Sequence, residues 1–259
     1  MAGQERNVKL RLENICKTFK NRDGESLVLD NINLDIYDNE FLCVVGPSGC
    51  GKSTLLNILA GLTDATSGTA YCNGVPIDGT GTERGVVFQQ YALFPWLTVK
   101  KNVMFALEMR GIKGKEAEAM AMTYLEGVHL SDYANHYPKE LSGGMKQRVA
   151  IACAYAAEPE VLLMDEPFGA LDAQTRMVLQ SDLLETWTKD RKTCFFITHD
   201  VEEAVFLSQR IVVMSTHPGR IADIIDVSLP YPRTQDLKMS PEFNEIRKNV
   251  WTQVYSDIL

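Results

Sequence analysis

Hydrophobic and polar residues alternate near the start of the chain, over residues 8–12 and again over 32–36. A period of two predicts antiparallel strands that keep one face in solvent. This region also contains turn residues at 21–24 and the Asn73-Gly74 pair, which is a strong hairpin signal. The pattern therefore predicts an antiparallel β subdomain in the first third of the chain.

Apolar runs without alternation also occur, and helical periods separate them. The runs lie at 41–45, 85–88, 161–164, 194–198 and 211–214. Continuous apolar strands between helices are typical of a parallel sheet that helices cover on both faces. We therefore predict an α/β fold with a parallel-sheet core.

A block of helical pattern interrupts this rhythm at about 91–150. Thr98 is a candidate N-cap for a helix over 99–109, and another helix is expected over 115–126. We expect this block to be a helical subdomain inserted into a single domain that covers residues 1–230.

A short helical extension is expected over 231–259. Ser240-Pro241 opens its amphipathic helix. The residues expected on its apolar face are Phe243, Ile246, Val250, Val254 and Ile258.

The composition indicates a globular protein with an acidic balance. Of its 259 residues 45% are hydrophobic, and the formal net charge is -8. Such a charge disfavours a dominant nucleic-acid interface. No run approaches the ~18 apolar residues that span a bilayer, and the N-terminal stretch has no apolar signal core. We therefore expect any action at a membrane to depend on a partner protein.

The clearest chemical motif is Gly46-Pro47-Ser48-Gly49-Cys50-Gly51-Lys52-Ser53-Thr54. It follows an apolar strand and precedes a helical pattern, which is the context of a phosphate-binding loop. Backbone N–H groups at a helix start can bind a polyphosphate. Lys52 is expected to reach the β- and γ-phosphates, and the Ser53 hydroxyl to ligate Mg²⁺. The motif therefore predicts nucleotide binding.

The cysteines indicate reduced thiols, because the six are scattered without the spacing of a zinc site. Cys50 differs because it lies inside the predicted phosphate loop. A reactive thiol is one interpretation, and a small residue that fits the turn is the one we favour.

An acidic pair, Asp165-Glu166, follows the apolar run at 161–164. Ligands of open parallel sheets bind beyond the carboxyl ends of the strands, so these side chains can face the phosphate loop. Asp165 is the candidate holder of Mg²⁺, directly or through water. Glu166 is the candidate base that polarises a water for attack on the γ-phosphate. The alternative is a solvated acidic turn.

Ser142-Gly143-Gly144 forms a second candidate anion site at a helix start. Alone, these residues indicate only an N-cap and a flexible turn. His199 follows the run at 194–198, a place that favours contact with the γ-phosphate. A lone histidine is, however, commonly a surface or core residue.

Together these residues resemble the ATP-binding subunit of an ABC transporter, over essentially the whole chain. The resemblance implies a P-loop NTPase (RecA-like) fold, with ATP and Mg²⁺ as its cofactors. It implies that 46–53 is the Walker A loop, 141–147 the family signature and 161–165 the Walker B strand. Met145 departs from the family, which more commonly has glutamine there.

The resemblance also implies roles for single residues. It makes Gln89 the Q-loop glutamine and a Mg²⁺ ligand, Glu166 the catalytic glutamate and His199 the switch histidine. Residues 168–172 resemble the D-loop, which adds Asp172 to the nucleotide site. Phe19 occupies the place of the aromatic residue that stacks on adenine.

A two-subunit mechanism follows from the same resemblance. Each ATP is expected to be clamped between Walker A of one subunit and the Ser142 signature of a second, with an identical copy favoured and a heterodimer left open. Gln89 is expected to report the nucleotide state to the helical block. The neighbouring aromatic cluster, Tyr91, Phe94, Pro95 and Trp96, is either a groove for the membrane permease or part of the core.

Shorter stretches resemble the nitrate/sulfonate/taurine branch of importer ATPases. They lie at 83–89, 93–96, 172–176 and 217–220. The branch implies an ATP hydrolase, a translocase at the cytoplasmic face of the cell membrane, that powers import through a separate permease. An extracytoplasmic solute-binding protein would be an indirect partner. None of these stretches selects a solute.

Three other classes of protein remain as alternatives. An ABC exporter subunit shares every ATPase motif and is the nearest of them. A soluble ABC ATPase acting on ribosomes or DNA would normally have two fused cassettes or a long coiled-coil insertion. A P-loop kinase or GTPase would use Lys52 and Ser53 but would leave 141–148 and His199 without a role.

Overall fold

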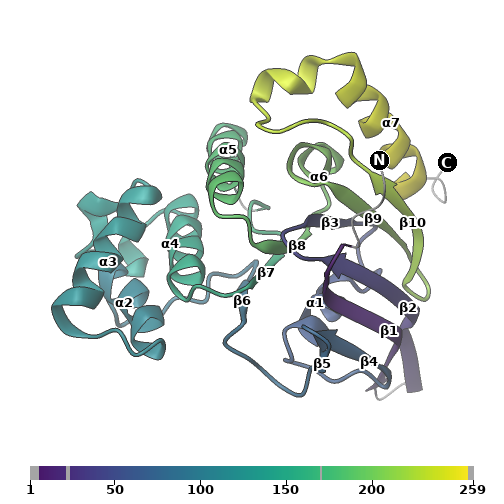
Figure 1. Ribbon diagram of the computed structural model, residues 1–259, viewed down its shortest axis with the longest axis horizontal. Coiled ribbons are helices and arrows are strands. Elements are labelled where there is room, and N and C mark those ends of the chain that lie inside the picture. The colour runs from purple at the N-terminus through teal and green to yellow at the C-terminus, as the bar shows by residue number, and fades with distance from the viewer. Residues whose placement is uncertain (1–5, 22–23, 170, 256–259) are drawn as a thin grey trace. The chain divides into compact units, whose positions relative to one another are not determined.

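The computed structural model describes residues 6–21, 24–169 and 171–255. The chain forms two compact units (Figure 1). The first unit contains residues 1–81 and 184–259, and the second unit contains residues 82–183. Helix α5 (Ala173–Lys189) runs through the point in the sequence where the second unit ends and the first resumes.

An antiparallel sheet in the first unit has the strand order β2-β1-β4-β5. Its strands are β1 (Val8–Asn21), β2 (Gly24–Tyr37), β4 (Ser67–Cys72) and β5 (Val75–Pro76). Asn73 and Gly74 join β4 to β5 with positive φ angles of 53° and 75°, the backbone that an asparagine–glycine hairpin adopts. The sheet confirms the predicted β subdomain. Residues 22 and 23 of the predicted turn at 21–24 lie outside the described residues.

The parallel strands of the first unit explain the uninterrupted apolar runs. Strand β3 (Phe41–Val45) pairs in parallel with β8 (Thr193–Ile197) on one side and with β9 (Arg210–Ser215) on the other. Every residue of β3 and β8 is buried. Because both faces of these strands are covered, the sequence shows no alternation. This part of the chain confirms the predicted parallel-sheet core.

Strand β10 (Arg220–Asp226) was not predicted. It pairs antiparallel with β9, and the register shifts between Ile221 and Asp223. The apolar residues of the strand fall in two adjacent pairs, Ile221-Ala222 and Ile224-Ile225, and only Ile225 is buried. The strand therefore lacks the alternation by which it could have been recognised.

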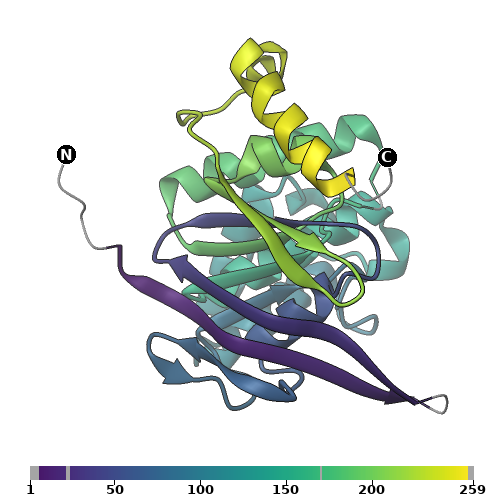
Figure 2. The ribbon, with the colours of Figure 1, turned by 90° about the vertical axis from the view of Figure 1, so that its right-hand side faces the viewer.

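The C-terminal helix α7 (Pro241–Tyr255), yellow in Figure 2, packs on α6 (Val201–Leu207) and β9. It begins after Ser240, as predicted, and follows a short 3-10 helix, η3 (Gln235–Met239). Phe243, Val250 and Val254 are buried, as predicted for its apolar face. Ile246 is half-buried, and Ile258 lies outside the described residues.

The second unit combines a pair of strands with a cluster of helices. Strands β6 (Arg84–Val87) and β7 (Val161–Asp165) are parallel neighbours. The helices are α2 (Val99–Met109), α3 (Gly114–Gly127) and α4 (Gly143–Ala156), with 3-10 turns η1 (Ser131–Tyr133) and η2 (Pro138–Glu140). Helices α2, α3 and α4 share one apolar core that includes Val103, Leu125 and Val149. The predicted N-cap is present, since the Thr98 side chain accepts a hydrogen bond from the Lys101 N–H.

Among the helices in the part of the chain that the structure describes, none has both the length and the apolar character required to cross a membrane.

Candidate functional site

The loop between β3 and α1 (Lys52–Leu59) is built on close backbone approaches. An ideal Cβ at Gly46 would lie 2.6 Å from the Met214 carbonyl oxygen, and one at Gly51 would lie 2.6 Å from Leu29 Cδ2. Gly49 and Gly51 also have positive φ angles of 82° and 92°, which disfavour other residues. The loop therefore requires its glycines for both conformation and space.

Lys52 is buried, and its Nζ lies among the loop's own atoms. It donates to the carbonyl oxygens of Gly46 at 2.8 Å and Pro47 at 3.1 Å, and lies 3.7 Å from Cys50 Sγ. Ser48, Gly49 and Ser53 are exposed on the same loop, while Thr54 is half-buried. The arrangement presents a positive charge and the first N–H groups of a helix together, which suits an anionic ligand.

Cys50 is fully buried in this loop. Burial raises the pKa of its thiol, and the nearby Lys52 charge opposes that rise. Because a thiol reacts as its thiolate, a buried thiol with a raised pKa is a poor nucleophile. The structure thus favours the interpretation of Cys50 as a small residue that fits the turn.

His199 lies at the same sheet edge as the phosphate loop. Val44 of β3 is paired with Ile197 of β8, and the Thr198 N–H donates to the Val44 carbonyl oxygen at 3.2 Å. Gly46 and His199 therefore follow neighbouring parallel strands at their carboxyl ends, where ligands of such sheets bind. The following residue, Asp200, caps α6 by accepting from the Glu202 and Glu203 N–H groups.

Phe19 lies on β1 and is 39% exposed. The Lys17 ammonium lies 5.0 Å from the centre of its ring. An exposed aromatic ring with a neighbouring cation is a suitable surface for a planar ring to stack on.

Glu166 and Gln89 meet in the second unit. Gln89 Nε2 donates to Glu166 Oε2 at 3.3 Å. Their strands explain the meeting, because β6 and β7 are parallel and pair Val87 with Met164 just before these residues. Glu166 also has a φ of 43°, a strained conformation for a residue with a side chain, which costs about 1–3 kcal/mol and is characteristic of functional sites. Asp165 is the last residue of β7 and is half-buried.

The signature residues begin α4 in the second unit. Ser142 is the N-cap, and its Oγ accepts from the Met145 N–H at 3.3 Å. An ideal Cβ at Gly143 would lie 3.0 Å from the Tyr91 hydroxyl oxygen, and one at Gly144 would lie 3.1 Å from Thr175 Cγ2. These positions are therefore crowded from two sides, and a side chain would push the neighbours away.

A groove of about 410 Å³ opens at this helix start. Asp172 borders it, and the Asp172 carboxylate accepts from the Thr175 N–H at 2.9 Å, which lowers the pKa of Asp172. The structure thus brings Asp172 beside Ser142. Ala170, in the predicted D-loop, lies outside the described residues.

Three further residues line this groove outside the stretches selected from the sequence, namely His129, Leu130 and Tyr133. Arg148, the last residue of the stretch at 141–148, lines the groove as well. His129 could not be selected from the sequence, because its place depends on the turn after α3, where it adopts a φ of 57°.

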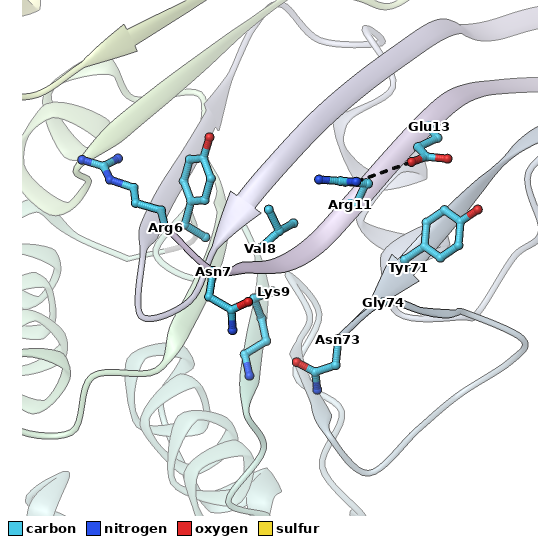
Figure 3. Close-up of a pocket in the computed structure, with 10 residues that line it drawn as sticks. Arg6, Asn7, Val8, Lys9, Arg11, Glu13, Tyr71, Asn73 and Gly74 are labelled. Carbon is cyan, nitrogen blue, oxygen red and sulfur yellow. Dashed lines mark ion pairs between the residues drawn. The ribbon is translucent and has the colours of Figure 1, made fainter. Parts of the chain in front are cut away.

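A larger groove, of about 1080 Å³, lies on the β subdomain (Figure 3). Its cations are already engaged: Lys9 pairs with Asp38, Arg11 with Asp35 and Glu13, and Arg6 lies over the Tyr37 ring. Because Lys9 and Arg11 are paired with carboxylates and Arg6 lies over an aromatic ring, we assign no ligand to this groove.

Within the described ranges no group of three or more His, Cys, Asp and Glu side chains is arranged to hold a metal ion. The predicted Mg²⁺ ligands are of another kind, because Ser53 and Gln89 contribute a hydroxyl and an amide oxygen and only Asp165 a carboxylate.

Comparison with known proteins identifies the family. Residues 29–169 match the family described as "ABC transporter". A putative ATP-binding protein of Brucella abortus is 57% identical over 234 residues, which are 90% of each chain. The nitrate import ATP-binding protein NrtD of Synechocystis is 48% identical over 90% of each chain. The aliphatic sulfonates import ATP-binding protein SsuB of Bacillus cereus is 46% identical, over 93% of this chain and 94% of the relative.

A solved structure agrees with these relatives. The dimeric, post-hydrolysis ATP-binding cassette MJ0796, bound to ADP and Pi, is similar with a TM-score of 0.78 and 34% identity, over 85% of this chain and 100% of that one. The fold and the family resemblance predicted from the sequence are therefore confirmed. The chain belongs to the ABC transporter family, as one of its ATP-binding, ATP-hydrolysing subunits.

Proposed function

We propose that this chain hydrolyses MgATP to power the import of a small solute through a separate membrane permease. The observation that carries the proposal is the loop at 46–54, in which Lys52 Nζ lies within a glycine-lined turn at a helix start. The direction of transport is supported by relatives named as import proteins for nitrate and for aliphatic sulfonates. We place the chain at the cytoplasmic face of the membrane, where its permease holds it.

The proposed roles follow the chemistry of each side chain. Residues 46–54 and Lys52 bind the phosphates, and Phe19 stacks on adenine. The Ser53 hydroxyl, the Gln89 amide oxygen and the Asp165 carboxylate are hard oxygen donors, the kind that Mg²⁺ prefers. Bound there, Mg²⁺ would neutralise charge on the β- and γ-phosphates.

Glu166 and His199 are the proposed reactive groups. The Glu166 carboxylate accepts a proton from the water that attacks the γ-phosphate, and Gln89 orients that carboxylate through the hydrogen bond described above. His199 contacts the γ-phosphate from the edge where β3 and β8 end. The strained backbone of Glu166 supports this assignment, because it holds the side chain in one direction.

A second copy of the chain is proposed to complete each site. The groove at Ser142, Gly143 and Gly144 opens at the start of α4 and borders Asp172, so it suits the γ-phosphate of an ATP held by a partner copy. The dimeric state of the similar cassette MJ0796 supports this arrangement. ATP would then hold two copies together until hydrolysis releases them.

An aromatic patch on the second unit is proposed to contact the permease. Trp96 is 71% exposed, and its ring centre lies 5.6 Å from that of Phe94. Phe94 in turn packs on Phe105 of α2, which is 41% exposed. Exposed aromatic side chains gathered in this way are typical of protein interfaces. Their exposure disfavours the alternative that this cluster is core.

Reconstitution tests the function. We expect the chain, its permease and the solute-binding protein in proteoliposomes to accumulate solute in the direction set by the binding protein, and only with MgATP. A Trp96→Ser variant should lower this transport at least about tenfold, because a buried interface tryptophan is commonly worth about 2 kcal/mol, while ATPase activity of the free chain stays within about twofold.

A matched control is Met239→Ser, which changes a side chain that is 86% exposed in the first unit. It should leave transport unchanged. Extrusion of a solute without any binding protein would contradict import, and full transport by the Trp96 variant would contradict the permease surface.

A further inference from the structure

The turn between β9 and β10, residues 216–219, is joined to β2 beside the phosphate loop. The Gly219 N–H donates to the Val28 carbonyl oxygen at 2.9 Å, and the Asp30 N–H donates to the Gly219 carbonyl oxygen at 3.0 Å. These bonds form a parallel bridge between Leu29 and Gly219. The turn is therefore fixed to β2 by hydrogen bonds from both the N–H and the carbonyl group of Gly219.

Gly219 also lies directly on the loop. An ideal Cβ there would be 2.1 Å from the Cys50 carbonyl oxygen, 3.1 Å from the Cys50 carbonyl carbon and 2.9 Å from the Val28 carbonyl oxygen. All three are backbone atoms, so a side chain could be accommodated only if the chain itself moved. Gly219 is not among the glycines with positive φ. The position therefore requires glycine because the backbone atoms of Cys50 and Val28 leave no room for a Cβ, and not because of its backbone conformation.

The loop is held from three directions in all. Met214 of β9 lies against Gly46, Leu29 of β2 lies against Gly51, and Gly219 lies against Cys50. Cys50 and Gly51 immediately precede Lys52, the first residue of α1. A shift of the Cys50 carbonyl would consequently rotate the peptide groups that lead into the helix start and its N–H groups.

An ion pair fastens the turn to β2 at the next residue. Arg220 Nε lies 2.9 Å from Asp30 Oδ2. The Arg220 side chain is 60% exposed and that of Asp30 25% exposed. Exposed pairs add little to global stability, so this pair is better suited to fix the local position of the turn than to stabilise the whole fold.

We propose that Gly219 is a positioning residue for nucleotide binding. The turn at 216–219 supports the backbone of Cys50 and Gly51 in the one arrangement in which the loop's N–H groups and Lys52 meet the phosphates together. Arg220 and Asp30 keep the turn in place. This inference rests on the proposed role of residues 46–54 in binding ATP.

The test is the affinity of the full chain for MgADP, measured by titration calorimetry. Gly219→Ala should raise the dissociation constant at least about tenfold, since each lost hydrogen bond to a charged phosphate costs about 10- to 150-fold in affinity. The control is Gly127→Ala at the end of α3, where nothing lies within 4 Å of an ideal Cβ and φ is not positive. Its affinity should equal that of the wild type.

Thermal unfolding separates positioning from folding. Without nucleotide, we expect Gly219→Ala and Gly127→Ala to melt within a few degrees of the wild type, while the rise in melting temperature on adding MgADP is lost only in Gly219→Ala. An unchanged affinity in a folded Gly219→Ala protein overturns the inference. A wild-type chain that binds no MgADP overturns the role of the loop itself, which is a different result.

Arg220 provides a second, milder variant if Gly219→Ala fails to fold. Arg220→Ala should weaken MgADP binding about threefold, and Arg220→Lys, which keeps the charge opposite Asp30, should recover most of that loss. Equal affinities for wild type, Arg220→Ala and Arg220→Lys overturn the proposal.

Discussion

A Glu166→Gln variant is expected to bind ATP with the affinity of the wild type and to hydrolyse it at least about a hundredfold more slowly, because a positioned general base contributes about 10²–10⁴ in rate. Glutamine has the shape of glutamate and can still meet Gln89, whose Nε2 lies 3.3 Å from Glu166 Oε2. It cannot accept the proton of the attacking water. The loss should therefore appear in turnover at saturating ATP and not in binding.

The measurement is phosphate release at saturating MgATP, together with the dissociation constant for ATP. Glu108→Gln is the matched control, because Glu108 is an exposed carboxylate on α2 of the same unit, and its turnover should equal that of the wild type. Turnover of Glu166→Gln within about threefold of the wild type would contradict the assignment of the base.

Lys52→Ala is expected to weaken ATP binding and to abolish measurable turnover. Lys52 Nζ is buried in the loop and already directs its donors at the Gly46 and Pro47 carbonyl oxygens. Hydrogen bonds to charged groups are worth about 1.5–3 kcal/mol, which corresponds to about 10- to 150-fold in the dissociation constant. Titration of MgATP into the variant measures this loss.

Lys115→Ala is the control for Lys52, since Lys115 is an exposed lysine on α3. Its ATP affinity should match the wild type. A Lys52→Ala protein that melts like the wild type and binds ATP equally well would show that the loop does not hold the phosphates.

Local patterns predicted much of the fold because the deciding contacts are close in sequence. Helix α2 begins and ends where expected, because Thr98 caps its first turn and Gly111 follows its end with a φ of 86°. Buried parallel strands such as β3 were recognisable from continuous apolar residues. Strand β10 was missed, because its apolar residues fall in adjacent pairs and lack the alternation that marks a strand.

The residues of the candidate site likewise fall into those that local sequence predicted and those that it did not. Residues 46–54 could be selected because they are contiguous, and Gln89 and Glu166 because each follows a strand. Nothing local indicated that Gly219 lies on Cys50, since 169 positions separate them in the sequence. His129 likewise lines the groove at Ser142, Gly143 and Gly144 only because of how the turn after α3 packs. The motif residues can thus be predicted from the sequence, whereas the residues that support them can be identified only from contacts between distant parts of the chain.

In the proposed mechanism, ATP joins two copies of this chain through the loop at 46–54 of one copy and Ser142 of the other. Sedimentation of Glu166→Gln with MgATP tests it most directly, because slow hydrolysis preserves the bound state. We predict a species of twice the chain mass with MgATP, the mass of one chain without nucleotide or with ADP, and loss of the larger species when Ser142→Arg is added. A protein that binds ATP yet sediments as a single chain, or a dimer that Ser142→Arg leaves intact, would contradict the claim.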